Sequence, residues 1–310
     1  DLKPIRTGCF SPKGDMMAIG TNLSSVKIFD IKALTSKYDK MNTYKYYNNF
    51  NQQEFDQSIE AQKKEVTQVK EIEKHHNGSI YCMDWSCSGK LIATGSNDQL
   101  VKCMVVPSLD FDDPEEGKLE LTMVGHKGIV RSVCFDPSEE LILLSAGQKD
   151  SSVRVWDPEE GKVKALLEGH SSDVNVIRWS NDGLLCASSG DDKTIRFWDV
   201  RSCKTVAIIS ALKAGKINDV SIYTRNKSST NTVVAAGHDN GSVTIWDYSS
   251  KDMIREVKNS GKIRSVSYSV DGKYLAVGSE NSVISVYDVD KDYSLVHSLK
   301  HDNQVVSLRW

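Results

Sequence analysis

One stretch of the chain combines the residue types of an acyl-transfer site. Residues 169–201 read GHSSDVNVIRWSNDGLLCASSGDDKTIRFWDVR and contain a histidine, several serines and aspartates, and two tryptophans. A hydrolase built on serine, histidine and aspartate needs its serine exposed beside an oxyanion hole. Ser188 instead lies in an apolar run that is typical of a buried strand. The stretch is therefore predicted to hold a fold together, and no catalytic residue is expected.

The end of this stretch recurs along the chain. KTIRFWD (193–199) is repeated as SSVKIFD (24–30), SSVRVWD (151–157), GSVTIWD (241–247) and NSVISVYD (281–288). The closing aspartates at 157, 199, 247 and 288 are 42, 48 and 41 residues apart. This spacing is close to the period of a four-stranded propeller blade.

A second shared piece precedes these repeats. It is an alternating strand that ends in an aromatic residue and a turn, and an apolar run follows it. The copies are GCFSPKG (8–14), MDWSCSG (83–89), VCFDPSE (133–139), IRWSNDG (178–184) and SYSVDGK (267–273). Each unit is thus predicted to contain strands separated by tight turns.

The GH pairs at 125 and 169 and the WD pairs at 156, 198 and 246 resemble the WD-repeat β-propeller family. The resemblance implies a hydrogen-bonded relay of histidine, a second-strand serine or threonine, a turn aspartate and tryptophan. A buried indole N–H without a partner costs roughly 1–3 kcal/mol, so such a relay should stabilise its blade. By position, the relays are His126, Ser145, Asp150 and Trp156, and His170, Ser188, Asp192 and Trp198.

The other units are expected to keep this relay unevenly. His75 and His76 stand where the second unit should have its GH pair, and Met104 stands in place of its tryptophan. The remaining departures are Ala236 for serine, Asn240 for aspartate and Tyr287 for tryptophan.

The units predict one all-β domain over residues 1–310, a seven-bladed WD-repeat β-propeller with one long loop insertion. Blades are expected to start near residues 5, 78, 128, 172, 217, 262 and 301. The seventh unit is HDNQVVSLRW (301–310), which has room for an inner strand only. We therefore expect the last blade to be incomplete in this chain and completed by residues after Trp310, because propellers avoid unpaired sheet edges.

The insertion is predicted at residues 32–74, between blades one and two. It is rich in Asn, Gln, Tyr and Lys and contains Lys37, Lys45, Tyr46 and Tyr47. Such a segment is either a mobile surface loop or an element that orders against a partner, and its tyrosines are unusual for a plain linker.

Acidic residues gather in three turns that the propeller resemblance places on one face. They are either a solvated surface or a docking site for a basic partner. The residues are Asp110, Asp112, Asp113, Glu115, Glu116, Glu139, Glu140, Glu159 and Glu160.

Composition argues against several classes of function. The formal net charge of -3, from 39 basic and 42 acidic residues, disfavours a nucleic-acid partner. No apolar run approaches a membrane span, and the N-terminus lacks a signal core, so a cytoplasmic protein without a membrane partner is predicted. The seven cysteines show no C-x-x-C spacing and are expected to be reduced. Neither a P-loop nor a histidine metal motif occurs, so no metal, no cofactor and no enzymatic activity are expected.

A closer resemblance, to microtubule-associated WD-repeat proteins, concerns function. It rests on residues 74–104 (KHHNGSIYCMDWSCSGKLIATGSNDQLVKCM), 5–22, 192–201 and 303–310. The resemblance implies a non-catalytic interaction scaffold in a larger complex of the cytoskeleton, including the central apparatus of the ciliary axoneme. The alternative is a substrate receptor of a cullin-based ubiquitin ligase, since FWDVR (197–201) matches the W-D-x-R box with Arg201 as the contact.

Overall fold

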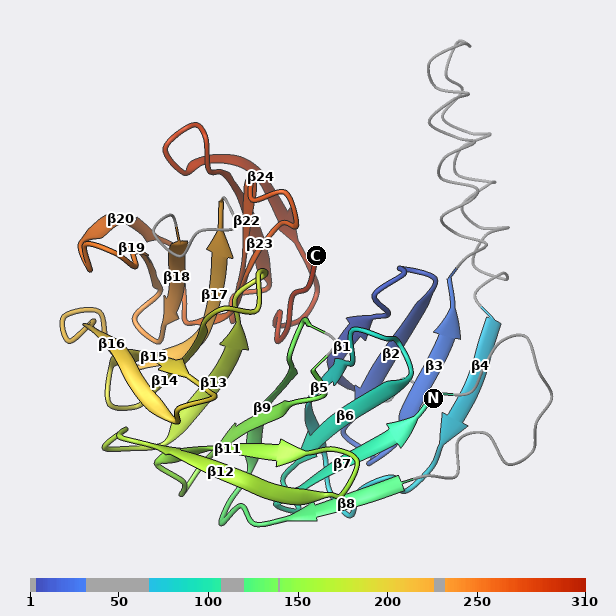
Figure 1. The fold of residues 1–310 in the computed structure, drawn as a ribbon. Helices are drawn as coiled ribbons and strands as arrows, with labels where there is room; N and C mark the ends of the chain where they lie inside the picture. Colours follow the sequence, from blue (N-terminus) through green and yellow to red (C-terminus); the bar gives the residue numbers. More distant parts are fainter. Residues whose placement is uncertain (1–3, 32–66, 107–119, 139, 226–231) are drawn as a thin grey trace, which may run out of the picture.

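The structure is a computed structural model that describes residues 4–31, 67–106, 120–138, 140–225 and 232–310 (Figure 1). These residues form 24 strands in six antiparallel sheets of four strands each. Strands follow one another in chain order within every sheet, and the first strands of consecutive sheets contact each other. The six sheets are therefore blades of a propeller, with the first strand of each blade innermost (Figure 1).

The strand bounds are as follows. Blade one has β1 (Ile5–Phe10), β2 (Met16–Thr21), β3 (Val26–Asp30) and β4 (Thr67–Ile72), and blade two has β5 (Ile80–Trp85), β6 (Leu91–Ser96), β7 (Leu100–Val105) and β8 (Glu120–Val124). Blade three has β9 (Val130–Phe135), β10 (Leu143–Gly147), β11 (Ser152–Asp157) and β12 (Lys162–Glu168), and blade four has β13 (Val174–Trp179), β14 (Cys186–Gly190), β15 (Thr194–Asp199) and β16 (Lys204–Ser210). Blade five has β17 (Ile217–Thr224), β18 (Thr232–His238), β19 (Ser242–Asp247) and β20 (Met253–Lys258), and blade six has β21 (Ile263–Tyr268), β22 (Tyr274–Ser279), β23 (Val283–Asp288) and β24 (Ser294–Lys300).

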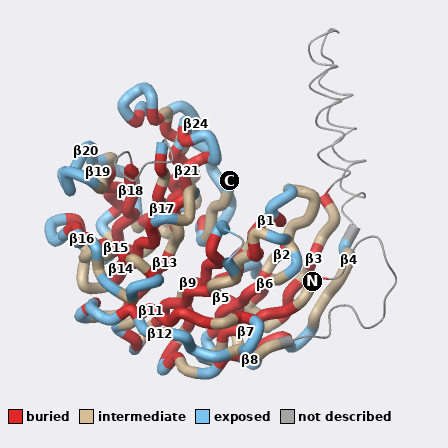
Figure 2. Tube along the Cα trace, in the orientation of Figure 1, coloured by how far each residue is buried: buried red, intermediate tan, exposed pale blue. Residues whose placement is uncertain are grey.

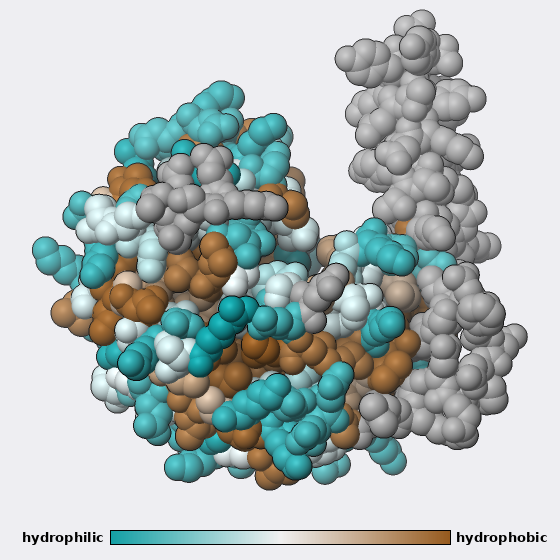
Figure 3. All heavy atoms as spheres, viewed as in Figure 1, coloured by the Kyte–Doolittle hydropathy of each residue, from teal (hydrophilic) through white to brown (hydrophobic). Residues whose placement is uncertain are grey.

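Burial falls from the inside of each blade to its edge. Second strands such as β10 and β14 are buried along their whole length, whereas every residue of the outer strand β24 is exposed (Figure 2). Apolar side chains from neighbouring blades pack together, as Phe197 of blade four does with Ile217 of blade five in one core cluster. Figure 3 shows hydrophilic residues over much of this face together with hydrophobic patches, and outer strands carry exposed apolar side chains such as Val206 and Ile208 of β16. The core thus lies between the sheets.

The connections divide between two faces of the propeller. We call the face where first strands begin the entry face and the face where they end the exit face. Because the strands alternate in direction, turns after second strands lie on the entry face, and turns after first and third strands lie on the exit face. The relay histidines of blades three and four precede first strands and so belong to the entry face.

Each first strand carries a β-bulge at its second residue. In blade four the pairing steps from Val174 opposite Gly190 to Val176 opposite Ser189, which leaves Asn175 unpaired. Bulges re-aim a side chain, and here they aim it toward the propeller axis. The six bulged residues, called the bulge ring below, are Arg6, Tyr81, Arg131, Asn175, Asn218 and Arg264.

The prediction of seven blades is wrong, because the structure has six. Residues 301–310, expected as the inner strand of a seventh blade, form no strand. They run beside blade six, where the backbone N–H of Val305 donates to Ser279 O at 3.3 Å and that of Leu308 donates to Ser265 Oγ at 3.1 Å. Isolated bonds of this kind do not make the repeating ladder that defines a strand.

Two expected loops fall largely outside the described residues. Residues 32–66 and 107–119 are not described, which covers most of the 32–74 insertion and the acidic run at 110–116. Residues 67–72 of that insertion form β4, the outer strand of blade one, paired with β3 from Val26 opposite Ile72 to Asp30 opposite Thr67. β3 therefore ends, and β4 begins, on the exit face of blade one.

Candidate functional site

The structure brings the four predicted relay residues of blade four together. His170, just before β13, lies with its Nδ1 2.7 Å from Asp192 Oδ2 and its Nε2 2.6 Å from Ser188 Oγ. The indole N–H of Trp198 donates to the same hydroxyl at 2.7 Å. Ser188 on β14 and Trp198 on β15 meet because the two strands pair with Cys186 opposite Trp198.

Blade three repeats this geometry. His126 Nδ1 is 2.8 Å from Asp150 Oδ2, and its Nε2 is 2.5 Å from Ser145 Oγ. Trp156 Nε1 donates to Ser145 Oγ at 2.7 Å. Arg154 adds a positive charge, with its Nη2 3.2 Å from Asp150 Oδ2.

In blade three the donors follow one direction when His126 is neutral. The indole N–H of Trp156 then donates to Ser145, the Ser145 hydroxyl donates to Nε2 of His126, and the His126 Nδ1–H donates to Asp150. Burial lowers the pKa of His126, opposed by its hydrogen bond to Asp150, which favours this neutral form. For Asp192, burial alone would raise the pKa, but the hydrogen bonds from His170 and Thr194 hold the pKa of that carboxyl well below its ordinary value.

The seryl hydroxyls are unsuited to nucleophilic attack. Ser145 and Ser188 have no exposed surface, and each hydroxyl is shared between a histidine and a tryptophan. A nucleophile must reach its substrate beside an oxyanion hole. The arrangement therefore stabilises the blades and does not resemble a hydrolase site.

Blade two keeps the polar part of the relay without a tryptophan. His76 Nδ1 lies 2.9 Å from Asp98 Oδ2, and Nε2 of both His75 and His76 lies 2.9 Å from Thr94 Oγ1. Burial would raise the pKa of Asp98, but the hydrogen bond and charge of His76 lower it to about 2. Met104, buried opposite Ile92, takes the tryptophan position and needs no hydrogen bond.

Blade five builds a relay that the sequence analysis missed. Ala236 was recognised as a lost serine, but Thr244, directly opposite it on β19, supplies the hydroxyl instead. Thr244 Oγ1 lies 2.8 Å from His238 Nε2 and accepts the Trp246 indole N–H at 2.8 Å. The imidazole comes from the end of β18 and not from the segment before β17. A third GH pair, at 237–238, was the signal for it.

Substituting Thr244 with valine should lower the free energy of unfolding by about 2 kcal/mol, since a near-isosteric side chain leaves one indole and one imidazole without their partner. Urea denaturation followed by tryptophan fluorescence measures this. Thr122→Val on the exposed face of β8 is the matched control and should change stability by less than about 0.5 kcal/mol. Equal stability of the two variants would contradict the blade-five relay.

Blades one and six depart further. Tyr287 occupies the tryptophan position opposite Leu275, and its hydroxyl donates to Asn259 Oδ1 at 2.7 Å. In blade one the position belongs to Phe29, opposite Met17, which has no polar group to satisfy. These blades rely on packing where blades three to five use a relay.

The candidate partner surface is described only in part. Lys37, Lys45, Tyr46, Tyr47, Asp110, Asp112, Asp113, Glu115, Glu116 and Glu139 lie outside the described residues. Glu140 and Arg201, both on the exit face, lie together, with Arg201 Nη2 2.6 Å from Glu140 Oε1 and side chains 79% and 53% exposed for arginine and glutamate. Glu140 of the predicted acidic docking surface and Arg201 of the W-D-x-R box thus form one surface ion pair.

The described acidic residues of the exit face have basic neighbours. Lys164 Nζ is 2.9 Å from Asp157 Oδ2, and Lys162 Nζ is 3.1 Å from Glu160 Oε2. Exposed pairs of this kind contribute little to stability, about 0–1 kcal/mol each, and exchange partners readily. The described part of this surface is therefore mixed in charge.

The seven cysteines are free thiols that differ in exposure. Five thiols, Cys9, Cys82, Cys103, Cys134 and Cys186, are buried, and Cys87 and Cys203 are partly exposed on the exit face. Burial raises the pKa of Cys82 and of Cys103 to about 12. Within the described ranges, no cluster of histidine, cysteine and acidic residues could hold a metal, and no helix is long and apolar enough to cross a bilayer.

Comparison with known families gives two matches. The profile of the WD domain, G-beta repeat, matches residues 66–103, 117–157 and 161–199, and that of the anaphase-promoting complex subunit 4 WD40 domain matches 228–310. In three dimensions, the crystal structure of the RRP9 WD40 repeats superposes with a TM-score of 0.73 at 17% identity, covering 99% of this chain and 84% of that one. At this identity the likeness shows the fold alone.

Three relatives illustrate the sequence similarity. Protein tipD of Dictyostelium discoideum is 27% identical over 257 residues, 69% of this chain and 40% of that protein. The ciliary WD repeat-containing protein ctxp80 of Euplotoides octocarinatus is 30% identical over 255 residues, 76% of this chain and 33% of that protein. Nuclear distribution protein PAC1 of Arthroderma otae is 24% identical over 274 residues, 79% of this chain and 58% of that protein. The chain spans less than two thirds of each relative.

The closer resemblance noted above is to nemitin, a microtubule-associated WD-repeat protein. Nemitin is not among the relatives named here, so that specific similarity stays a prediction. Membership of the WD40-repeat family rests on three other findings. They are the six four-stranded blades, the relays and the two WD40 profile matches. Together they show that the chain belongs to the WD40-repeat family.

Proposed function

We propose that the chain is a non-catalytic protein-interaction scaffold of microtubule-associated or ciliary assemblies in the cytoplasm. The relay is the observation that supports a non-catalytic role. Its serines, histidines and aspartates are buried and bonded to one another, so the residue types that could react are used within the blades. WD40 propellers are interaction scaffolds, and no enzyme family is evident among the matches.

The inference that the partner belongs to the cytoskeleton rests on the relatives and on the charge of the exit face. One similar protein is named as ciliary and another as a nuclear distribution protein. The exit face carries exposed Glu140, Glu159 and Glu160 and is where β3 ends and β4 begins. The ion pairs of Glu140 and Glu160 are exposed and weak, so these carboxylates can pair instead with a basic microtubule-associated partner, whereas the acidic surface of tubulin would be repelled. The partner would accordingly be an axonemal protein and not the bare microtubule.

Co-sedimentation of the full-length protein tests this proposal. The protein should pellet with axonemes prepared from a ciliate and should not pellet with microtubules of purified tubulin. The double variant Glu159→Lys/Glu160→Lys should lose most of this binding, because it reverses charge on the exit face. Glu73→Lys/Glu168→Lys, which makes the same net change at exposed positions on the entry side, is the control. Absence of the wild-type protein from the axonemal pellet would rule out the proposal.

The ligase hypothesis makes a different prediction. If Arg201 contacted a cullin adaptor, Arg201→Ala would remove that adaptor from affinity-purified complexes and leave the axonemal association intact. Arg201 is exposed but is engaged by Glu140 and by the turn, where its backbone N–H donates to Asp199 Oδ1 at 3.0 Å. An unchanged partner set in the Arg201→Ala variant would leave the scaffold proposal as the better account.

A further inference from the structure

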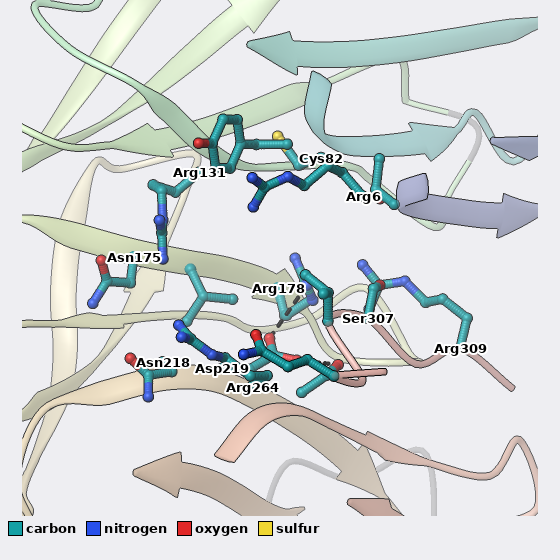
Figure 4. Close-up of a pocket in the computed structure, with 16 residues that line it drawn as sticks. Arg6, Cys82, Arg131, Asn175, Arg178, Asn218, Asp219, Arg264, Ser307 and Arg309 are labelled. Atoms are coloured by element: carbon teal, nitrogen blue, oxygen red, sulfur yellow. Dashed lines mark hydrogen bonds and ion pairs between the residues drawn. The ribbon is translucent and has the colours of Figure 1, made fainter. Parts of the chain in front are cut away.

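A cavity of about 170 Å³ lies at the centre of the propeller and is rich in arginine. All six residues of the bulge ring line it, together with deeper residues such as Arg178 and Arg309. Figure 4 shows the guanidinium groups of Arg6, Arg131, Arg178, Arg264 and Arg309 directed into one shared space. Five such groups converge in a chain whose formal net charge is -3.

The deeper part of the cavity is balanced in charge. Arg178 Nη2 lies 3.3 Å from Asp219 Oδ1, and Asp219 Oδ2 also accepts the Ser265 hydroxyl at 2.8 Å. Asp84 is close enough to Arg309 for their charges to interact. Two arginines and two carboxylates therefore offset each other below the ring.

The bulge ring itself carries an excess of positive charge. Arg6 and Arg131 lie over the ring of Tyr81, with their guanidinium carbons 5.0 Å and 5.9 Å from its centroid. Arg264 Nη2 is 3.4 Å from Glu280 Oε2, and this glutamate is the one carboxylate that the described residues pair with a ring arginine. A second carboxylate, Asp191, accepts from the Asn175 amide at 3.0 Å and is paired with Lys216. Three ring arginines against Glu280 therefore leave the entry side of the cavity positive.

Arg131 has the strongest need for an anion. The Arg131 guanidinium contacts the ring of Tyr81. No described carboxylate forms an ion pair with Arg131. Burial lowers the pKa of Arg131 and the positive charge of Arg264 lowers it further, whereas Tyr81, Cys82 and Asp191 oppose the shift. An anion placed between Arg131 and Arg264 would relieve both the desolvation and the repulsion.

The geometry restricts what this anion can be. The amides of Asn175 and Asn218 are held by the next blade, donating to Ile217 O at 3.0 Å and Ile263 O at 2.9 Å, so the ring is fixed before a ligand arrives. The cavity is smaller than the roughly 300–1,000 Å³ of pockets that enclose drug-sized ligands. It therefore suits one compact group. Guanidinium forks match phosphoryl oxygens, which accept paired N–H bonds.

We propose that the bulge ring binds a phosphoryl group, carried on a phosphorylated side chain of a partner protein that docks on the entry face. The proposal rests on the chain being a protein-interaction scaffold but not on a cytoskeletal partner. A free polyanionic ester is the less favourable source, since Asp219 also lines the cavity and would repel its further phosphates.

Fluorescence polarisation on the full chain tests the proposal with three probes. They are a fluorescein-labelled peptide bearing one phosphothreonine, the same peptide unphosphorylated, and inositol hexakisphosphate as a competitor. The phosphopeptide should bind at least about tenfold more tightly than its unphosphorylated form, and added salt should weaken it. Arg131→Gln and Arg264→Gln should each weaken it by about tenfold or more, and Arg131→Lys by less, because lysine keeps the charge without the fork.

Arg255→Gln, on the exposed outer strand β20, is the matched control and should bind the phosphopeptide as the wild type does. Thermal melting of each variant verifies that it is folded. Equal binding of the two peptides, or wild-type binding by folded Arg131→Gln and Arg264→Gln, would overturn the proposal. If the chain bound inositol hexakisphosphate but not the phosphopeptide, the proposal that a partner protein carries the phosphoryl group would be overturned. Because axonemal co-sedimentation is a separate measurement with exit-face variants, failure of either proposal is distinguishable from failure of the other.

Discussion

Replacing Asp192 with alanine is expected to lower the free energy of unfolding by about 3 kcal/mol, because several donors lose a charged acceptor at once. The carboxylate accepts from His170 Nδ1 at 2.7 Å, from the backbone N–H of Ser171 at 3.2 Å and of Thr194 at 3.0 Å, and from the Thr194 hydroxyl at 2.8 Å. Alanine leaves these donors without an acceptor. Urea denaturation followed by tryptophan fluorescence measures the loss.

Asp252→Ala is the control for this variant. Asp252 is exposed in the turn between β19 and β20 and should change stability by less than about 0.5 kcal/mol. Phosphopeptide binding by folded Asp192→Ala protein should match the wild type, because Asp192 does not line the cavity. A melting temperature unaffected by Asp192→Ala would show that the relay does not stabilise blade four.

Gly190→Ala should be the most damaging single-methyl change, with a loss of about 3 kcal/mol or more, at or beyond the upper end for overpacking. Gly190 ends β14 opposite Val174, beside the bulge at Asn175. A Cβ there would lie 2.0 Å from the carbonyl oxygen of Asp173, a backbone atom that also accepts the Asp191 N–H at 3.0 Å. Relief requires the backbone to move, which opens the bulge.

Gly8→Ala separates this clash from the general effect of alanine in a strand. Gly8 is also a strand glycine, but its Cβ would approach nothing closer than 3.3 Å, the distance to Ala18 O. Its substitution should cost at most about 1 kcal/mol, and chemical denaturation of both variants gives the comparison. If Gly190→Ala were as stable as Gly8→Ala, the bulge would be more plastic than the geometry implies.

The sequence predicted what repeats and missed what does not. The relays of blades three and four lie where the resemblance placed them, because GH, second-strand serine and WD are fixed by strand register. The blade-five relay was not predicted because its hydroxyl comes from Thr244 and not from position 236. Thr244 lies directly opposite Ala236 on the neighbouring strand, eight positions further along the chain. Cross-strand opposition is a property of register and has no local sequence signal.

The sequence did not predict the arginine cavity and predicted the wrong number of blades, because both depend on contacts between distant parts of the chain. Arg6, Arg131 and Arg264 are far apart in sequence and converge only because each sits on the bulge of its own first strand. A net charge of -3 averages over the surface and hides such a local excess. The seventh blade was inferred from an inner-strand pattern, but a pattern forms a strand only where a second strand pairs with it.

The distribution of thiols gives the propeller a chemical polarity. Cys87 and Cys203, the partly exposed thiols of the described residues, both lie in exit-face turns, whereas the buried five are shielded and held protonated. Only accessible thiolate reacts at an appreciable rate. A maleimide-bearing support should therefore capture the molecule by its exit face, through Cys87 or Cys203, and leave the entry face with the bulge ring turned toward the solution.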